Sequence, residues 1–186
     1  MRVISGKYKG RKLMSPHGEV RPTTDMVKGS VFSMLSSRGA ISGAKCLDVF
    51  CGSGGMGIEA LSRGADECVF VDADTSNASE NLKRIGLDCR LVRGDFRKSL
   101  RLLRGEKFDL IFCDPPYKSG FAEIALGLVF KYDLLGENGI VIVEHSTEND
   151  LIFQAENCIM ERRTFGVTTF EFITRGDNAS NIRGNV

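Results

Sequence analysis

LDVFCGSGGMG, residues 47–57, is the stretch of sequence that decides the fold. It begins with apolar residues typical of a buried strand, and Gly52, Gly54 and Gly57 then follow in the spacing G-x-G-x-x-G. Glycines in this arrangement allow a tight turn between a strand and a helix, and they let the backbone approach a ligand closely. Because the spacing alone is weak evidence, the surrounding residues must indicate which ligand the loop binds.

Strand and helix patterns alternate on the carboxyl-terminal side of this loop. We expect strands at 45–50, 68–72, 89–93, 108–113 and 139–144, and helices near 55–63, 75–85, 96–104 and 120–131. The runs CVFV and LIFC are continuously apolar, as expected for strands that are buried on both faces. This alternation predicts an α/β fold with a doubly wound, Rossmann-like sheet that is mostly parallel.

The two ends of the chain depart from this alternation. Residues 2–14 predict an N-terminal β-hairpin extension of two short strands, and 158–174 predict an antiparallel hairpin that closes one sheet edge. RPTTDMVKGSVFSML, residues 21–35, predicts a helix with Thr23 or Thr24 as its N-cap. We therefore expect an extension over 1–20, one domain over 21–175 and a mobile polar tail over 176–186.

The composition is that of a soluble globular protein. The chain has 186 residues, of which 42% are hydrophobic and 26% charged. It has no apolar run near the roughly 20 residues that span a bilayer, and its start lacks the apolar region of a signal peptide. The six cysteines form no C-x-x-C pair, which argues against a zinc site. We expect a cytoplasmic protein, and nothing in the sequence demands more than a monomer.

The net charge of +1 hides an uneven distribution. Residues 1–28 hold seven basic and two acidic residues, a net of +5, so the remainder carries about −4. A basic arm on a mildly acidic body is typical of a phosphate-binding protein, although a solvated surface segment fits the charge equally well. The candidate phosphate ligands in the arm include Lys7, Lys9, Arg11 and Lys12.

Acidic residues at the ends of successive strands indicate the cofactor. Asp72 ends the second predicted strand, twenty residues after Gly52, where a carboxylate reaches ribose hydroxyls, and this first suggests a nicotinamide dinucleotide. Asp48, however, lies directly before the loop and would repel a pyrophosphate by several kcal/mol in a low dielectric. S-adenosylmethionine has a sulfonium, an ammonium, a ribose and an adenine but no phosphate, so we predict this cofactor.

Each part of that cofactor has a candidate partner. Asp48 suits the cationic amino-acid end, Gly52 and Gly54 allow close backbone approach, and Asp72 suits the ribose. Asp95, in RGDF after the third strand, can accept from the adenine amino group while Phe96 lies against the ring. Structural roles remain open for these acids, because Asp72 and Asp95 can cap helices and Asp48 can be a satisfied core acid.

The segment DPPY, residues 114–117, follows the fourth strand and suits methyl transfer to an exocyclic amino group of a base. The Asp114 carboxylate and the Pro115 carbonyl can accept from the amino group and localise the nitrogen lone pair. The second proline, Pro116, keeps the corner stiff. Tyr117 offers a ring for stacking, worth about 1–3 kcal/mol per base. The alternative is a tight structural turn with an exposed tyrosine.

The sequence resembles the RsmD-type 16S rRNA guanine-N2 methyltransferases, which are class I enzymes that use S-adenosylmethionine. The matching segments span most of the chain in order: RVISGKYKGRKL, RPTTDMVKGSVFSML, CLDVFCGSGGMGIEALSRGA, VFVDAD and FCDPPY. The resemblance implies methyl transfer to a guanine N2 in small-subunit rRNA. It also implies that the N-terminal hairpin and the RPTTD segment, with Arg21 and Thr23, help to hold RNA and cofactor. Met26 and Gly29 stand where the family usually has Arg and Glu.

Three other functions fit the sequence less well. A DNA adenine-N6 methyltransferase uses the same D-P-P-Y chemistry but normally needs more chain for target recognition. A nicotinamide-dependent oxidoreductase is disfavoured by Asp48 and by the lack of a substrate domain. A non-catalytic ribosome-binding module is disfavoured by Asp114 and Tyr117, which it would not need.

Overall fold

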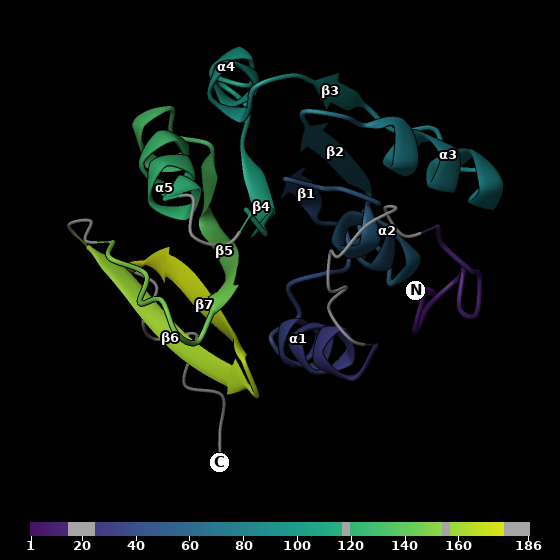
Figure 1. Ribbon diagram of the computed structural model, residues 1–186, viewed down its shortest axis with the longest axis horizontal. Coiled ribbons are helices and arrows are strands. Elements are labelled where there is room, and N and C mark those ends of the chain that lie inside the picture. Colours follow the sequence, from purple (N-terminus) through teal and green to yellow (C-terminus); the bar gives the residue numbers. More distant parts are fainter. Residues whose placement is uncertain (15–24, 117–119, 154–156, 177–186) are drawn as a thin grey trace.

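The protein is built around one seven-stranded sheet with the strand order β3-β2-β1-β4-β5-β7-β6 (Figure 1). The computed structural model describes residues 1–14, 25–116, 120–153 and 157–176. The strands are β1 (Lys45–Val49), β2 (Glu67–Asp72), β3 (Leu91–Arg93), β4 (Phe108–Cys113), β5 (Leu135–Ser146), β6 (Cys158–Phe165) and β7 (Thr168–Arg175). The first five run parallel, and β5, β7 and β6 pair antiparallel. This confirms the predicted mostly parallel sheet with a C-terminal hairpin.

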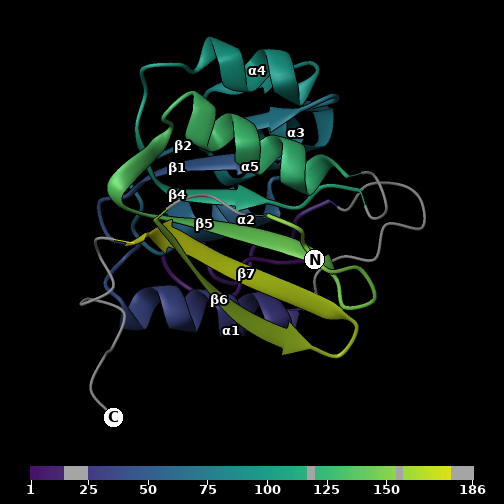
Figure 2. The ribbon, with the colours of Figure 1, turned by 90° about the vertical axis from the view of Figure 1, so that its left-hand side faces the viewer.

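Helices cover both faces of the sheet (Figures 1 and 2). The helices are α1 (Asp25–Ser37), α2 (Gly55–Ser62), α3 (Ser76–Ile85), α4 (Phe96–Leu102) and α5 (Phe121–Lys131). One apolar cluster joins α1, α2 and α3 to the sheet, and a second joins α4 and α5 to its other face. The alternation of strand side chains explains both clusters, because β1 gives Cys46 to the first and Leu47 to the second.

The observed strand bounds differ from the predicted ones mainly at β3 and β5. β5 begins at Leu135 rather than near residue 139, and its pairing with β4 has an irregularity between Phe108 and Leu110. The polar residues Glu137 and Asn138 interrupt the apolar pattern there, so periodicity alone could not show that the strand starts earlier. β3 has only three residues, Leu91–Arg93, which pair with Phe70, Val71 and Asp72 of β2. Residues 89 and 90, which were predicted to begin the strand, lie outside it.

The N-terminal segment folds back on itself, but its pairing is too short to form strands. Arg2 and Lys12 form an isolated antiparallel bridge, and the Leu13 N–H donates to the Met1 carbonyl over 3.0 Å. The expected pair of short strands is therefore corrected to a compact turn. The physical reason is that backbone N–H groups of this segment, including that of Lys7, donate to Glu59 and Ser62 of α2 instead of pairing with each other.

The predicted domain boundary near residue 20 and the predicted mobile tail fall, except for Gly176, outside the described residues. Within the described part of the chain, no helix is both long and apolar enough to cross a bilayer.

Candidate active site

The glycine loop turns sharply between β1 and α2. Gly52 and Gly54 have φ angles of 52° and 78°, in the left-handed region that glycine tolerates best. At Gly57 a Cβ would lie 2.5 Å from a ring carbon of Phe70, so glycine lets α2 pack directly on β2. Phe50 also has a positive φ, 62°, which is rare for a bulky residue and is typical of strained functional loops. No signal in the sequence indicated the strain at Phe50.

Two of the predicted cofactor ligands hold this loop in shape. Asp48 Oδ2 accepts from the Gly57 N–H over 2.9 Å, and Asp72 Oδ2 accepts from the Gly52 N–H over 2.8 Å. Asp72 Oδ1 also accepts from the Asp74 N–H over 3.0 Å. These acids therefore shape the loop, while their contacts to a ribose and an amino-acid group remain predictions.

The electrostatics of Asp48 suit a cationic ligand. Burial raises the pKa of Asp48 to about 7, although the Gly57 N–H opposes this and the nearby Asp72 charge adds to it. Only 3% of the residue is exposed. A positive group placed beside Asp48 would favour the ionised carboxylate, so the donor set fits the ammonium and sulfonium of S-adenosylmethionine.

Asp95 caps α4, which is the structural role left open by the sequence. Its Oδ1 accepts from the backbone N–H groups of Arg97 and Lys98 over 3.0 and 3.4 Å. Phe96 is buried, and its ring centroid lies 4.8 Å from that of Phe50 and 5.2 Å from that of Phe121. The adenine contacts of Asp95 and Phe96 remain predictions, with the cap placing both residues at the carboxyl end of β3.

Asp114, which directly follows β4, and Glu144 of β5 form a carboxylate pair. Cys113 of β4 is paired with Val143 of β5, so the next residues along the two strands, Asp114 and Glu144, lie side by side. Neighbouring protein atoms displace water from around the Asp114 carboxylate and raise its pKa above the ordinary value, and repulsion from Glu144 and then Asp48 adds to this rise. Asp114 still reaches solvent at the surface whereas Glu144 is buried, so water weakens both effects at Asp114. Sequence reasoning missed Glu144 because the pairing of β4 with β5 is what brings it to Asp114.

The remaining predicted catalytic residues follow Asp114 directly. Pro115 and Pro116 line a small hollow of about 80 Å³, together with Glu144 and neighbouring residues of β5 and α5. Both peptide bonds are trans, since the described chain contains no cis peptide. Tyr117 lies outside the described residues, so its stacking role remains a prediction.

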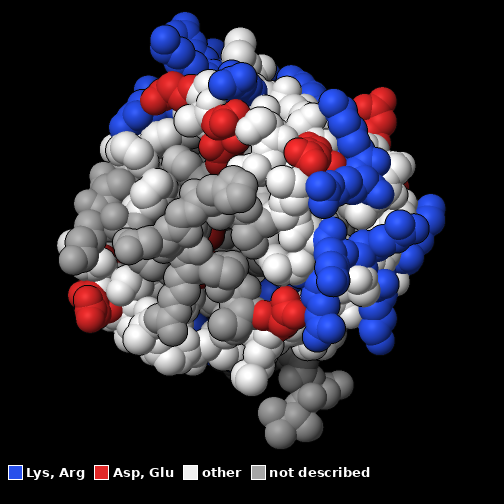
Figure 3. Space-filling model, turned by 45° about the vertical axis from the view of Figure 1, so that its right-hand side comes forward, with Lys and Arg blue, Asp and Glu red and all other residues white. Residues whose placement is uncertain are grey.

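The predicted RNA-binding residues of the N-terminal segment are exposed, and Lys7 lies away from the catalytic edge. Lys7, Lys9, Arg11 and Lys12 are all exposed, and the Lys7 N–H donates to the Ser62 carbonyl at the far end of α2. Eight residues of helix place that end about 12 Å from the glycine loop. Figure 3 shows basic side chains gathered along one side of the molecule. The other two predicted ligands, Arg21 and Thr23, lie outside the described residues.

A buried ion pair that the sequence did not reveal fastens this segment to the body. Glu59 of α2 is fully buried, and Lys28 of α1 is 1% exposed, with Lys28 Nζ 3.4 Å from Glu59 Oε2. Glu59 also accepts from the N–H groups of Ile4 and Ser5 over 2.8 and 3.0 Å and from Arg63 Nε over 2.8 Å. Lys28 is therefore a core residue and not part of the basic surface that the charge count suggested.

Comparison with known proteins places this geometry in a class. The structure of "Putative methyltransferase yhhF" from Escherichia coli superposes with a TM-score of 0.84 at 31% identity, covering 94% of this chain and 97% of that one. The structure of "SMU.776, a putative methyltransferase complexed with SAH" shares the fold alone, with a TM-score of 0.62 at 16% identity over 83% of this chain and 50% of that one. The fold is that of the class I methyltransferases.

The particular family follows from the sequence comparisons. Residues 1–174 match the family described as "Conserved hypothetical protein 95", and the chain belongs to this family. "Putative rRNA methyltransferase YlbH" of Bacillus subtilis is 41% identical over 177 residues, covering 90% of this chain and 95% of that protein. "Ribosomal RNA small subunit methyltransferase D" of Escherichia coli is 33% identical over 156 residues, covering 81% and 77%. The RsmD resemblance is thereby confirmed.

Proposed function

We propose that this protein transfers a methyl group from S-adenosylmethionine to the N2 amino group of a guanine in 16S rRNA. Methylation of rRNA is what the names of its relatives support. The choice of guanine N2 is our extension from the RsmD resemblance, since the D-P-P-Y segment suits any exocyclic amino group of a base. We further propose that the protein acts as a monomer on the small ribosomal subunit or its precursor.

The observation that carries the proposal is the meeting of two features at one sheet edge. The glycine loop with Asp48 and Asp72 follows β1 and β2, and Asp114-Pro115-Pro116 follows the adjacent β4. Ligands of open α/β sheets bind at the carboxyl ends of the strands, next to the point where strand order reverses. That point lies between β1 and β4 in this sheet, so a cofactor on the loop and a base at Asp114 would meet there.

The bound cofactor supplies an electrophilic methyl group on a sulfonium. The residues of this chain orient the acceptor: Asp114 and the Pro115 carbonyl accept its N–H groups and direct the nitrogen lone pair toward the methyl group. Asp48, Gly52, Gly54 and Asp72 would hold the cofactor, whose sulfonium would give up its methyl group to the amino nitrogen, and the nitrogen would then lose a proton to water. No strong general base is required, so orientation of the two reactants provides most of the acceleration.

The decisive experiment supplies methyl-labelled S-adenosylmethionine and 30S subunits from cells that lack the enzyme, followed by nucleoside analysis of the rRNA. Label in N2-methylguanosine is the expected result. Label in N6-methyladenosine would keep the chemistry of Asp114 but overturn the assigned base. Absence of label in rRNA, from protein that binds the cofactor, would overturn the proposal.

The variant Asp114→Ala tests the assigned catalytic residue. We expect loss of methyl transfer with the affinity for S-adenosylmethionine retained, because Asp114 is assigned to the acceptor and not to the cofactor. Equilibrium binding of the cofactor and single-turnover methylation measure the two effects separately. If a folded variant lost cofactor binding and methyl transfer to the same extent, this role would be contradicted.

A further inference from the structure

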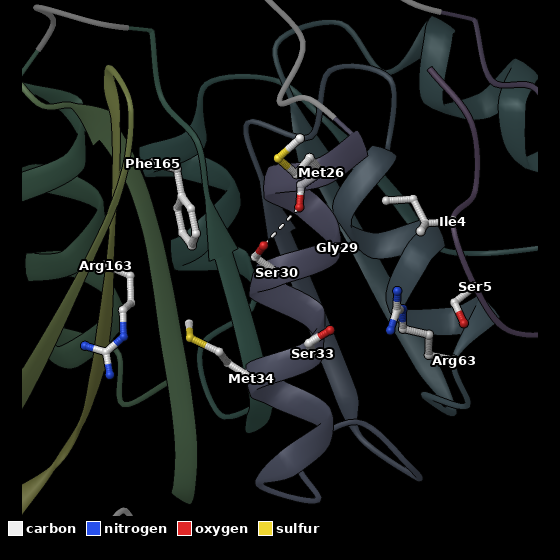
Figure 4. Close-up of a pocket in the computed structure, with 10 residues that line it drawn as sticks. All are labelled: Ile4, Ser5, Met26, Gly29, Ser30, Ser33, Met34, Arg63, Arg163 and Phe165. Atoms are coloured by element: carbon white, nitrogen blue, oxygen red, sulfur yellow. Dashed lines mark hydrogen bonds between the residues drawn. The ribbon is translucent and has the colours of Figure 1, made fainter.

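The face of α1 that points away from the sheet forms the floor of an open hollow of about 700 Å³ (Figure 4). Its floor includes Met26, Gly29 and Met34 of α1. Figure 4 shows Phe165 and Arg163 of β6 on one side of the helix. Ile4, Ser5 and Arg63 lie on the other side of the helix. Its volume falls within the range of ligand-binding clefts.

This hollow extends from the catalytic edge toward the basic N-terminal turn. α1 begins at that edge, because the loop after Ser37 leads to the opposite edge, where β1 starts. Phe165 lies at the same edge as Met26, because it pairs with Thr168, which pairs with Ser146 at the carboxyl end of β5. Arg63 directly follows α2, beside the turn that contains Lys7. The hollow therefore joins the catalytic edge to the exposed basic residues of the N-terminal segment.

The chemistry of the lining favours a nucleic acid strand. Two of the ten lining residues are arginines and none is acidic. Arg63 lies mostly buried against Glu59, whereas Arg163 keeps 47% of its side chain exposed beside its partner Glu161, so Arg163 is the arginine that can face an anionic chain. Phe165, Met26 and Met34 offer apolar and aromatic surface for unstacked bases, and Met26 is 81% exposed. At Gly29 an added Cβ would meet no atom within 4 Å, so the absence of a side chain there keeps the floor open.

We propose that this hollow, the α1 groove, binds single-stranded rRNA next to the methylated nucleotide, with Arg163 on a phosphate and Phe165 against a base. The inference rests on the proposed function and adds the path of the RNA across the protein. This path connects the catalytic corner with the basic N-terminal segment.

The test compares Arg163→Glu with Arg101→Glu, which makes the same change of charge on α4, at the opposite face of the sheet. We expect the dissociation constant for a 16S rRNA fragment containing the methylated nucleotide to rise about tenfold for Arg163→Glu relative to Arg101→Glu. The salt dependence should also weaken, by about 0.7 in the slope of log K against log salt for one lost single-strand contact. Equal affinity and slope in the two variants would overturn the proposal.

Gly29→Gln provides a second test that the fold should tolerate, because glycine is a poor residue in a helix interior and the added side chain meets open space. We expect a raised KM for rRNA and an unchanged affinity for S-adenosylmethionine, whereas Gly29→Ala should resemble the wild type. Weaker binding of Arg163→Glu to 30S subunits but not to the fragment would indicate a protein partner and overturn the RNA assignment. Wild-type protein that methylates no rRNA would instead refute the proposed function itself.

Discussion

The buried carboxylate of Glu59 should control both the stability of the fold and the attachment of the N-terminal segment. It accepts from two backbone N–H groups, of Ile4 and Ser5, and it faces the ammonium of Lys28 and the guanidinium of Arg63. Glu59→Gln would keep the size of the side chain but leave Lys28 charged and nearly fully buried. Removing one partner of such a pair costs about 3–5 kcal/mol of unfolding free energy, a large share of the roughly 5–15 kcal/mol typical of a domain.

Urea unfolding followed by circular dichroism measures this loss. With a slope of about 2 kcal/mol per molar urea, the midpoint should fall by about 1.5–2.5 M. Glu80→Gln is the matched control, because Glu80 forms a half-exposed pair with Arg84 and should contribute less than about 1 kcal/mol. Adding Lys28→Met to Glu59→Gln removes the stranded charge and should recover part of the stability. Equal midpoints for Glu59→Gln and Glu80→Gln, or no recovery in the double variant, would refute this reasoning.

Three further substitutions should each change a measurable property in a direction that the structure predicts. Gly6→Ala should destabilise the protein and release the N-terminal segment from protection in hydrogen exchange, because its Cβ would lie 1.7 Å from the Ser62 carbonyl oxygen; normal protection would refute this contact. Glu144→Gln should move the acid limb of the pH–rate profile to lower pH, because it removes a like charge that helps to raise the pKa of Asp114; an unmoved limb would contradict the coupling. The pKa of Asp48 is raised from 3.8 to about 7, so its ionisation destabilises the cofactor-free protein progressively between these values. Asp48→Asn should therefore raise the melting temperature at pH 8 more than at pH 4, and equal shifts at both pH values would refute this.

Local patterns were sufficient to predict most of the sheet and the glycine loop. Apolar runs such as CVFV indicate strands buried on both faces, and the G-x-G-x-x-G spacing identifies the turn because only glycine suits both its φ angles and its close packing. The carboxyl ends of parallel strands share one edge, so the sequence also predicted that Asp48, Asp72 and Asp114 would gather there.

The residues that sequence reasoning missed depend on contacts between distant parts of the chain. Glu59 lies 31 residues after Lys28 and looks like an ordinary helix-surface acid until α1 and the N-terminal segment pack against it. Glu144 becomes part of the site only through the pairing of β4 with β5. The charge count assigned Lys28 to a basic surface for the same reason, because burial is a property of packing and not of composition.

The antiparallel hairpin at the end of the chain also protects the protein from uncontrolled self-association. Its outer strand, β6, forms one border of the sheet, where unpaired backbone groups could template the addition of a strand from another molecule. Glu161, Arg162 and Arg163 occupy the middle of that border, and their charges oppose such addition. The other border, β3, is only three residues long. One edge strand of the sheet, β6, is charged, and the other, β3, is short. Both features disfavour the addition of further strands and growth into a fibril.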